Sequence, residues 1–99
     1  MDGYTGMVIG VLTASIEIPE SGSLKDKRHA LRSLLDGLRN KYNVSAAELD
    51  RQDSWKFSTI GVACISSDKA FANKVLDSIA DRVDSDPRLV LLDYSIEFV

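Results

Sequence analysis

The sequence is poor in the side chains that form covalent or metal cross-links. Its 99 residues include one cysteine, Cys64, and one histidine, His29. A single thiol excludes an internal disulfide and a multi-cysteine metal site. Asp50 and Asp53 with nearby Glu48 are better explained by a polar turn than by a cation site, so no metal or cofactor is expected. Cys64 lies in the apolar run IGVACIS and is predicted to be a buried, reduced thiol.

Long apolar runs are also absent. No segment approaches the roughly 20 consecutive apolar residues of a membrane helix. The N-terminal segment has no basic region, and Thr13, Ser15 and Glu17 interrupt its apolar stretch, so no signal peptide is expected. Hydrophobic residues make up 44% and charged residues 27% of the chain, which is typical of a folded protein. We therefore expect one cytoplasmic domain, residues 1–99.

Motifs of classical catalysis are missing as well. The sequence contains no P-loop, no G-x-G-x-x-G before a helix, and no readable Ser-His-Asp or Cys-His arrangement. An enzyme acting on a small phosphorylated or carboxylated molecule would have only His29, Glu48 and Asp53 as acid–base groups. These three residues are expected on different faces, and the sequence predicts that the protein is not an enzyme.

Strand and helix periods alternate along the chain. The two-residue alternation of half-buried strands occurs in residues 7–18, 44–49, 55–66 and 89–98. In the last of these, the predicted inward side chains are Val90, Leu92, Tyr94, Ile96 and Phe98. Ser23 and Asp26 resemble a capping box. It precedes an apolar helical stripe of Leu24, Leu31, Leu34, Leu35, Leu38 and Tyr42. A second helix is expected between Asp68 and Pro87, with a buried stripe of Phe71, Val75, Leu76, Ile79 and Val83.

This order of elements predicts an α+β fold. Strand, helix, strand, strand, helix, strand is the pattern of the ferredoxin-like βαββαβ sandwich. Both helices then cover one face of a four-stranded antiparallel sheet. The other face is left open to a second subunit or a ligand.

Half of the chain's cations lie in the first predicted helix. Residues 24–42 contain six Lys or Arg and two Asp, a net charge of +4, so the rest of the chain carries −7. On an ideal helix, four of these cations form a ridge beside the leucine stripe. They are Lys25, Arg28, Arg32 and Arg39, and Lys27 falls on the opposite flank.

Two interpretations of this ridge remain open. The cations can form a solvated flank whose stems cover the core and whose charges pair with Asp36. Alternatively, the ridge binds an anion, and the helix start at Ser23 adds free backbone N–H groups. A phosphate backbone is the natural long anion. In that case we expect phosphate contacts from Lys25, Lys27, Arg28, Arg32 and Arg39.

Apolar side chains on the open sheet face form a second predicted interface. They are Met7, Ile9, Val11, Trp55, Phe57 and Ile65. Such a patch is large for a monomer, so a homodimer is expected. Trp55 and Phe57 could also stack bases, as aromatic residues do in RNA-recognition folds, but the K/R-G-F/Y signature of those folds is absent.

Two segments of the sequence resemble motifs of a known protein family. SLKDKR, residues 23–28, is similar to the S-L-K-x-K-R motif of the YlxP-like family of small bacterial proteins. Residues 42–66 resemble its second block, a V-S-x-A-E segment followed by D-x-W and a strand. The matching positions are Ser23, Leu24, Lys25, Lys27, Arg28, Ser45, Glu48, Asp53 and Trp55.

The resemblance covers nearly the whole chain and implies a ferredoxin-like fold, but no established activity and no catalytic residues. Family genes commonly lie among those of transcription and translation factors, which implies contact with RNA or the ribosome. The predicted function is therefore a non-enzymatic accessory module that binds RNA or a ribosomal particle through the ridge. The alternative is a homodimeric protein-interaction or regulatory module that uses the open sheet face.

Overall fold

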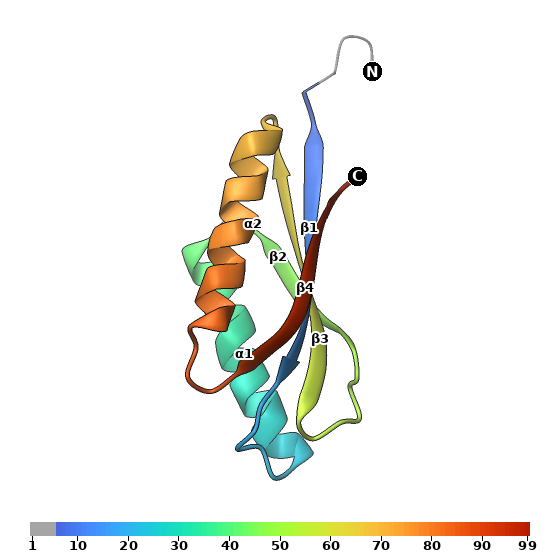
Figure 1. The fold of residues 1–99 in the computed structure, drawn as a ribbon, viewed down its shortest axis with the longest axis vertical. Coiled ribbons are helices and arrows are strands. Elements are labelled where there is room, and N and C mark those ends of the chain that lie inside the picture. Colours follow the sequence, from blue (N-terminus) through green and yellow to red (C-terminus); the bar gives the residue numbers. More distant parts are fainter. Residues whose placement is uncertain (1–5) are drawn as a thin grey trace.

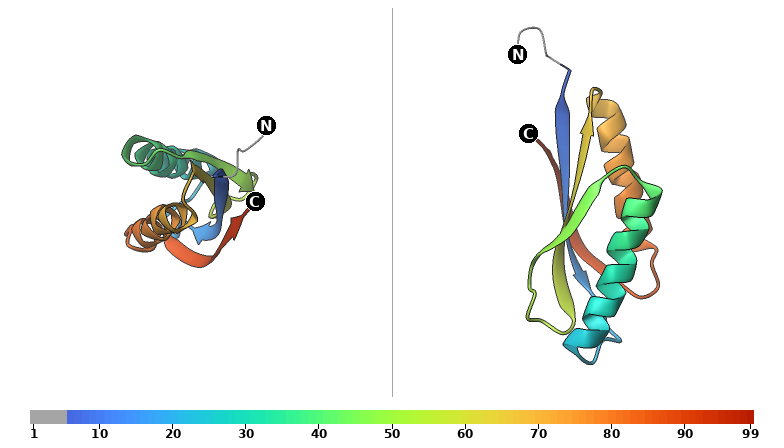
Figure 2. Two further views of the ribbon diagram at one scale, coloured as in Figure 1. Left: turned by 90° about the horizontal axis from the view of Figure 1, so that it is seen from above. Right: turned by 180° about the vertical axis from the view of Figure 1, so that it is seen from behind.

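A four-stranded sheet carries two helices on one of its faces in the computed structural model, which describes residues 6–99 (Figures 1 and 2). The elements are β1 (Val8–Glu17), α1 (Leu24–Lys41), β2 (Ser45–Asp50), β3 (Phe57–Ser66), α2 (Lys69–Asp84) and β4 (Val90–Phe98). The strands lie in the order β2-β3-β1-β4, and every neighbouring pair is antiparallel. The predicted ferredoxin-like βαββαβ fold is confirmed.

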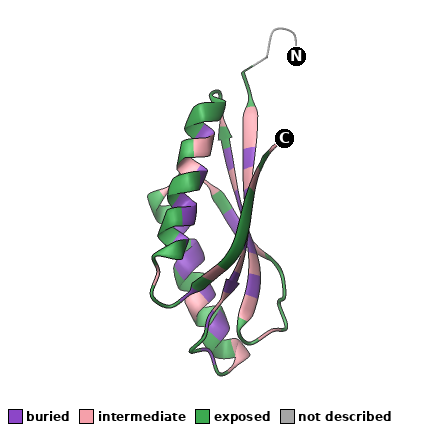
Figure 3. Ribbon diagram, in the orientation of Figure 1, coloured by how far each residue is buried: buried purple, intermediate pink, exposed green. Residues whose placement is uncertain are grey.

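The core lies between the sheet and the helices, where Figure 3 shows most of the buried positions. Alternation places Leu12, Ala14 and Ile16 of β1 on the inner face, and all three are buried as predicted. The Cys64 thiol on β3 is 3% exposed, which confirms the predicted buried cysteine. No helix within residues 6–99 has both the length and the apolar character that crossing a membrane requires.

The first helix follows the predicted pattern closely. Ser23 caps α1, because its hydroxyl oxygen accepts a hydrogen bond from the Asp26 N–H at 3.0 Å. Four leucines at helical spacing are buried against the sheet: Leu31, Leu34, Leu35 and Leu38. The leucine stripe therefore fixes which face of α1 points outward.

The second helix departs from the prediction at one position. Leu76, Ile79 and Val83 are buried as expected, but Phe71 is 57% exposed and does not belong to the stripe. Phe71 lies five residues before Leu76, which turns it about 140° away around the helix. Small Ala72 occupies the buried position in that turn instead.

The last strand also corrects the prediction. Ser15 pairs with Asp93 and Ile16 pairs with Leu91, so Leu92 is an extra residue in a bulge. The bulge reverses the alternation and places Val90 beside Glu17 on the open face. The inward assignment of Val90 and Leu92 is therefore wrong.

Candidate nucleic-acid interface

A groove between α1 and β2 contains the exposed part of the predicted ridge. Arg28, Arg32 and Arg39 project along one side of α1, and Arg28 and Arg32 lie one helical turn apart, about 6 Å along the axis. The groove has a volume of about 380 Å³. We call it the basic groove, and it is lined by Arg28, Leu31, Arg32, Leu35, Asp36, Arg39 and Glu48.

The three arginines differ in how firmly they are held. Arg39 donates from Nη1 to Asp36 Oδ1 at 2.7 Å and from Nη2 to the Ala46 carbonyl at 2.8 Å. Its guanidinium is thereby positioned against β2 and partly neutralised. Arg28 and Arg32 are exposed and make no hydrogen bond or ion pair with other residues of the 6–99 range. Their charges are available to an external anion.

Lys27 does not belong to the exposed surface, and its predicted phosphate contact is wrong. The side chain is 1% exposed. Its ammonium group lies 3.0 Å from Glu48 Oε2 and donates to the Arg51 carbonyl at 2.5 Å. On the helical wheel Lys27 falls about 40° from Leu31, within the leucine stripe, so burial follows from the way α1 packs. The signal was present in the sequence: a lysine within an apolar stripe requires a buried acceptor.

Glu48 is that acceptor. The sequence placed it near the end of the predicted strand 44–49 and, with Asp50 and Asp53, next to a polar turn, without a partner. In the structure Glu48 lies on β2 and pairs with buried Ile60 of β3, so its side chain points toward α1. Its Oε2 forms an ion pair with the Lys27 ammonium at 3.0 Å and accepts a hydrogen bond from the Ser58 hydroxyl at 2.7 Å. Glu48 also lines the basic groove, and 22% of its side chain is exposed. The sequence did contain a signal for this orientation: Glu48 lies two residues after buried Ala46 in the same strand, so both side chains face the same side of the sheet.

The start of α1 already holds a carboxylate of this chain. Ser23 accepts from the Asp26 N–H, and Asp26 Oδ2 accepts from the Gly22 N–H at 3.0 Å. An external anion at this end of the helix would meet the charge of Asp26. Ser23 therefore acts as a cap here, and its role in an anion site stays a prediction. Lys25 is exposed in the same turn but lines a different hollow.

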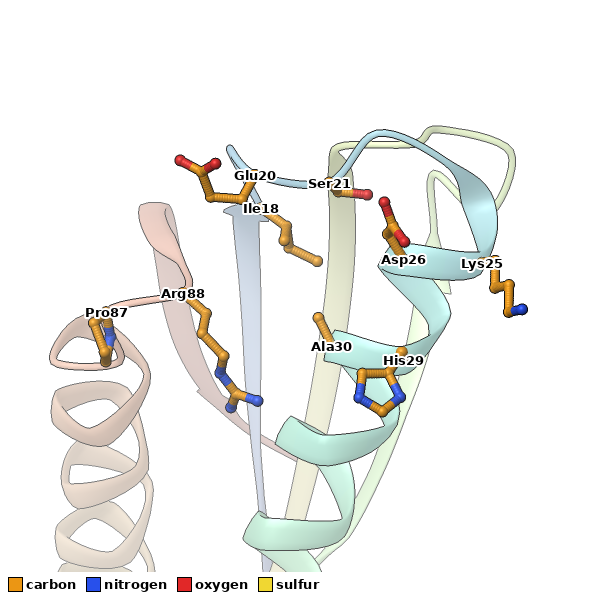
Figure 4. Close-up of a pocket in the computed structure, with 9 residues that line it drawn as sticks. All are labelled: Ile18, Glu20, Ser21, Lys25, Asp26, His29, Ala30, Pro87 and Arg88. Atoms are coloured by element: carbon orange, nitrogen blue, oxygen red, sulfur yellow. The ribbon is translucent and has the colours of Figure 1, made fainter.

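That second hollow, of about 630 Å³, lies between the start of α1 and the loop after α2 (Figure 4). His29 and Ala30 line it from α1, and Arg88 points into it from the loop. Arg88 is held by Asp86, with Nη2 2.7 Å from Oδ2, and by the Ser33 hydroxyl at 2.9 Å. The hydrogen bond from Arg88 holds the pKa of the Asp86 carboxyl below its ordinary value.

The acid–base residues considered for an enzyme are dispersed. His29 lines the hollow in Figure 4, whereas Glu48 lies across α1 in the basic groove. Asp53 lines a shallow depression in the loop between β2 and β3. In the part of the chain that the structure describes, no three His, Cys, Asp or Glu side chains are grouped to hold a metal ion.

The apolar residues of the open face form two groups. Ile9 pairs with Ile65, but Phe57 pairs with Glu17 at the other end of β1, about 26 Å away. Hydroxyl side chains lie between these ends, since Ser15 pairs with Thr59. Met7, Ile9, Val11 and Ile65 therefore gather at one end, and Trp55 and Phe57 lie at the other. The single patch that the sequence predicted is divided.

Exposure differs within these groups. Met7 is 53% and Ile65 61% exposed, whereas Ile9 and Val11 are half-buried. Trp55 precedes β3 and is 57% exposed, which the sequence left undecided.

Comparison with known proteins gives a family and a fold. Residues 9–96 match the family described as "Protein of unknown function (DUF503)". An "Uncharacterized protein YlxP" of Bacillus subtilis (strain 168) is 35% identical over 82 residues, which span 83% of this chain and 89% of the relative. The structure of "De novo designed protein Foldit4" superimposes with a TM-score of 0.52 at 13% identity, over 94% of this chain and 96% of the other. At that identity, the superposition concerns the fold alone.

Proposed function

Since this chain belongs to the DUF503 family, in agreement with the predicted resemblance to YlxP-like proteins, we propose a function from the geometry of its basic groove. The protein is a non-enzymatic accessory module that binds RNA, free or within a ribosomal particle. Arg28 and Arg32 contact phosphates, and Arg39 extends the same row.

The observation that carries the proposal is the pair of unpartnered arginines on α1. Arg28 and Arg32 are exposed, adjacent and without an acidic partner among residues 6–99. Guanidinium groups bind phosphate oxygens in bidentate fashion, and two of them one turn apart can hold a strand in one orientation. Because the remainder of the chain outside residues 24–42 carries −7, nucleic acid is repelled from other surfaces. A small, oriented contact area follows.

The structure also limits the size of this contact area. Lys27 is buried and Lys25 lies beside the other hollow, so three arginines remain in the basic groove. From Arg28 to Arg39 the row is about 16 Å long. Affinity for a single strand should therefore fall with salt, with a slope of about −2 when the logarithm of the association constant is plotted against the logarithm of the salt concentration.

The test is co-sedimentation with ribosomal subunits and with total RNA at several salt concentrations. We expect salt-sensitive binding by the wild type and its loss in the double variant Arg28→Glu, Arg32→Glu. The matched control is Lys69→Glu, Lys74→Glu, which makes the same charge change on exposed positions of α2. Binding should survive in that control.

Two outcomes would contradict the proposal. One is equal binding by the Arg28→Glu, Arg32→Glu variant when its circular dichroism and melting temperature match the wild type. The other is no sedimentation of the wild type with either partner at low salt, which would leave the arginines as a solvated flank of α1.

A second candidate function uses the open sheet face. Met7 and Ile65 expose more than half of their surfaces beside half-buried Ile9 and Val11. Such a group of apolar side chains is typical of a contact with a second subunit. A homodimer through this end of the sheet leaves the basic groove free, so the two proposals are compatible.

A further inference from the structure

A carboxylate lies among the arginines of the basic groove, and its orientation is fixed. Glu48 Oε2 forms an ion pair with the ammonium of buried Lys27 at 3.0 Å and accepts a hydrogen bond from the Ser58 hydroxyl at 2.7 Å. These two partners come from α1 and β3, so they hold the side chain from both sides. Glu48 is therefore ordered before any ligand binds.

The second oxygen of the same carboxylate is free. Oε1 accepts no hydrogen bond from residues 6–99, and the side chain lines the groove with 22% of its surface exposed. An ionised carboxylate can only accept hydrogen bonds. A phosphate oxygen placed against it would be repelled. The groove thus offers Arg28 and Arg32 to phosphate and one fixed acceptor to a neutral donor.

We infer that Glu48 accepts a hydrogen bond from a ribose 2′-hydroxyl of the bound strand, and that the basic groove thereby selects RNA over DNA. This inference rests on the proposed function. Every phosphate that an arginine holds has a ribose directly attached, so a 2′-hydroxyl comes near the groove whatever the base sequence. The 2′-hydroxyl is the group by which a protein can tell RNA from DNA.

The test that needs no variant compares three single strands of one sequence at one salt concentration. They are RNA, DNA and 2′-O-methyl RNA, in which the 2′-oxygen can accept but not donate. Fluorescence anisotropy should show that RNA binds about tenfold more tightly than either of the others, because both leave the carboxylate without its donor. Equal binding of all three strands would overturn the inference, and so would tighter binding of DNA or of 2′-O-methyl RNA than of RNA.

The variant Glu48→Gln tests the residue itself. Lys27 can only donate, so the amide oxygen must remain with it, and the amide NH₂ turns toward the groove. A donor then replaces the acceptor. We expect the variant to bind RNA, DNA and 2′-O-methyl RNA within about twofold of one another, whereas a Glu48 that only neutralises Lys27 would keep the wild-type ratio. Thermal unfolding checks that the variant is folded, and the three-strand comparison stands if it is not.

Asp36→Asn is the matched control. Asp36 lines the same groove, but it is 57% exposed and pairs with Arg39. Its removal makes the same charge change as Glu48→Gln, so affinity for all three strands should rise together and their ratio should not change. The two proposals fail in different ways. Absence of binding to every strand refutes the groove as a nucleic-acid site, whereas binding without sugar preference refutes only the role of Glu48.

Discussion

The ammonium group of Lys27 lies inside the protein because two groups replace its water. Glu48 supplies the opposite charge, and the Arg51 carbonyl accepts a hydrogen bond. Ser58 in turn donates a hydrogen bond to the Glu48 carboxylate. Buried ion pairs often contribute little net stability, but removal of one partner leaves the other without compensation. At the scale of single residues, Lys27 therefore connects α1 to β2 and to the loop that follows it.

Loss of this lysine should destabilise the protein without changing its exposed charge pattern. We expect Lys27→Met to lower the free energy of unfolding by about 2 to 3 kcal/mol, somewhat less than for a fully buried pair because Glu48 is partly exposed. Urea unfolding should show a lower midpoint at an unchanged m value.

Two further variants make this prediction specific. Lys25→Ala, which changes an exposed lysine of the same motif, should stay within about 0.5 kcal/mol of the wild type. The double variant Lys27→Met, Glu48→Leu should regain at least half of the loss, because no unpaired charge remains. A single variant as stable as the wild type would show that the buried pair does not hold the elements together.

At the scale of helices and strands, hydrogen bonds from loop side chains determine how the helices are oriented against the sheet. Lys56 donates to the Pro19 and Ser21 carbonyls at 2.6 and 2.9 Å, which joins the β2–β3 loop to the start of α1. Arg88 joins the turn after α2 to Ser33 of α1 while it is held by Asp86. Long-range contacts of this kind orient α1, and with it the row of arginines.

The Asp86–Arg88 pair makes stability depend on pH in the acid range. The pKa of Asp86 is lowered from its ordinary value of 3.8 because the folded carboxylate accepts hydrogen bonds from Arg88. A carboxyl group whose pKa is lower in the folded state stabilises the fold at pH values above its pKa in the unfolded state. This contribution is lost as the pH falls through its pKa in the folded state. We expect the melting temperature of Asp86→Asn to lie below that of the wild type from about pH 5 to 7 and to approach it below about pH 4.

The control for this titration is Asp84→Asn. Asp84 is exposed at the end of α2 and makes no ion pair within the described residues, so its replacement should have a small effect that is nearly independent of pH. A constant difference between wild type and Asp86→Asn down to about pH 3 would mean that the ion pair does not contribute.

At the scale of the whole molecule, the sheet and α1 present two surfaces of different chemistry. Figure 2 shows both helices on one side of the sheet, so the open face points away from them. The basic groove lies between α1 and β2, whereas the apolar group of Met7, Ile9, Val11 and Ile65 lies on the open face. The proposed dimer contact and the proposed anion site therefore lie on separate surfaces and do not exclude one another.

The dimer is tested by sedimentation velocity over a range of protein concentrations. We expect the mass of the wild type to rise toward that of a dimer and Ile65→Asp to remain monomeric, because a charge at this exposed position opposes burial against a partner. Ile65 is 61% exposed, so its replacement should leave the fold intact. Leu92→Asp, at a 51% exposed position in the β4 bulge, should still dimerise. A wild type that stays monomeric at high concentration excludes this interface but does not affect the RNA proposal.

From the sequence alone, the order of the elements, the leucine stripe of α1 and the Ser23 cap could be predicted. Each depends on residues a few positions apart, where the periods of helix and strand and the geometry of a helix end act directly. The cluster of cations on one helix could be recognised for the same reason.

Only the tertiary structure decided which of those cations remain available and what lies beside them. Lys27 is buried because β2 places Glu48 under α1, and the open-face patch is divided because Ile9 and Phe57 lie at opposite ends of the paired strands. The exposure of Val90 and Leu92 on β4 follows from one bulge opposite Ser15 and Ile16. These features depend on strand register and on contacts between residues far apart in the chain, which local periodicity does not encode.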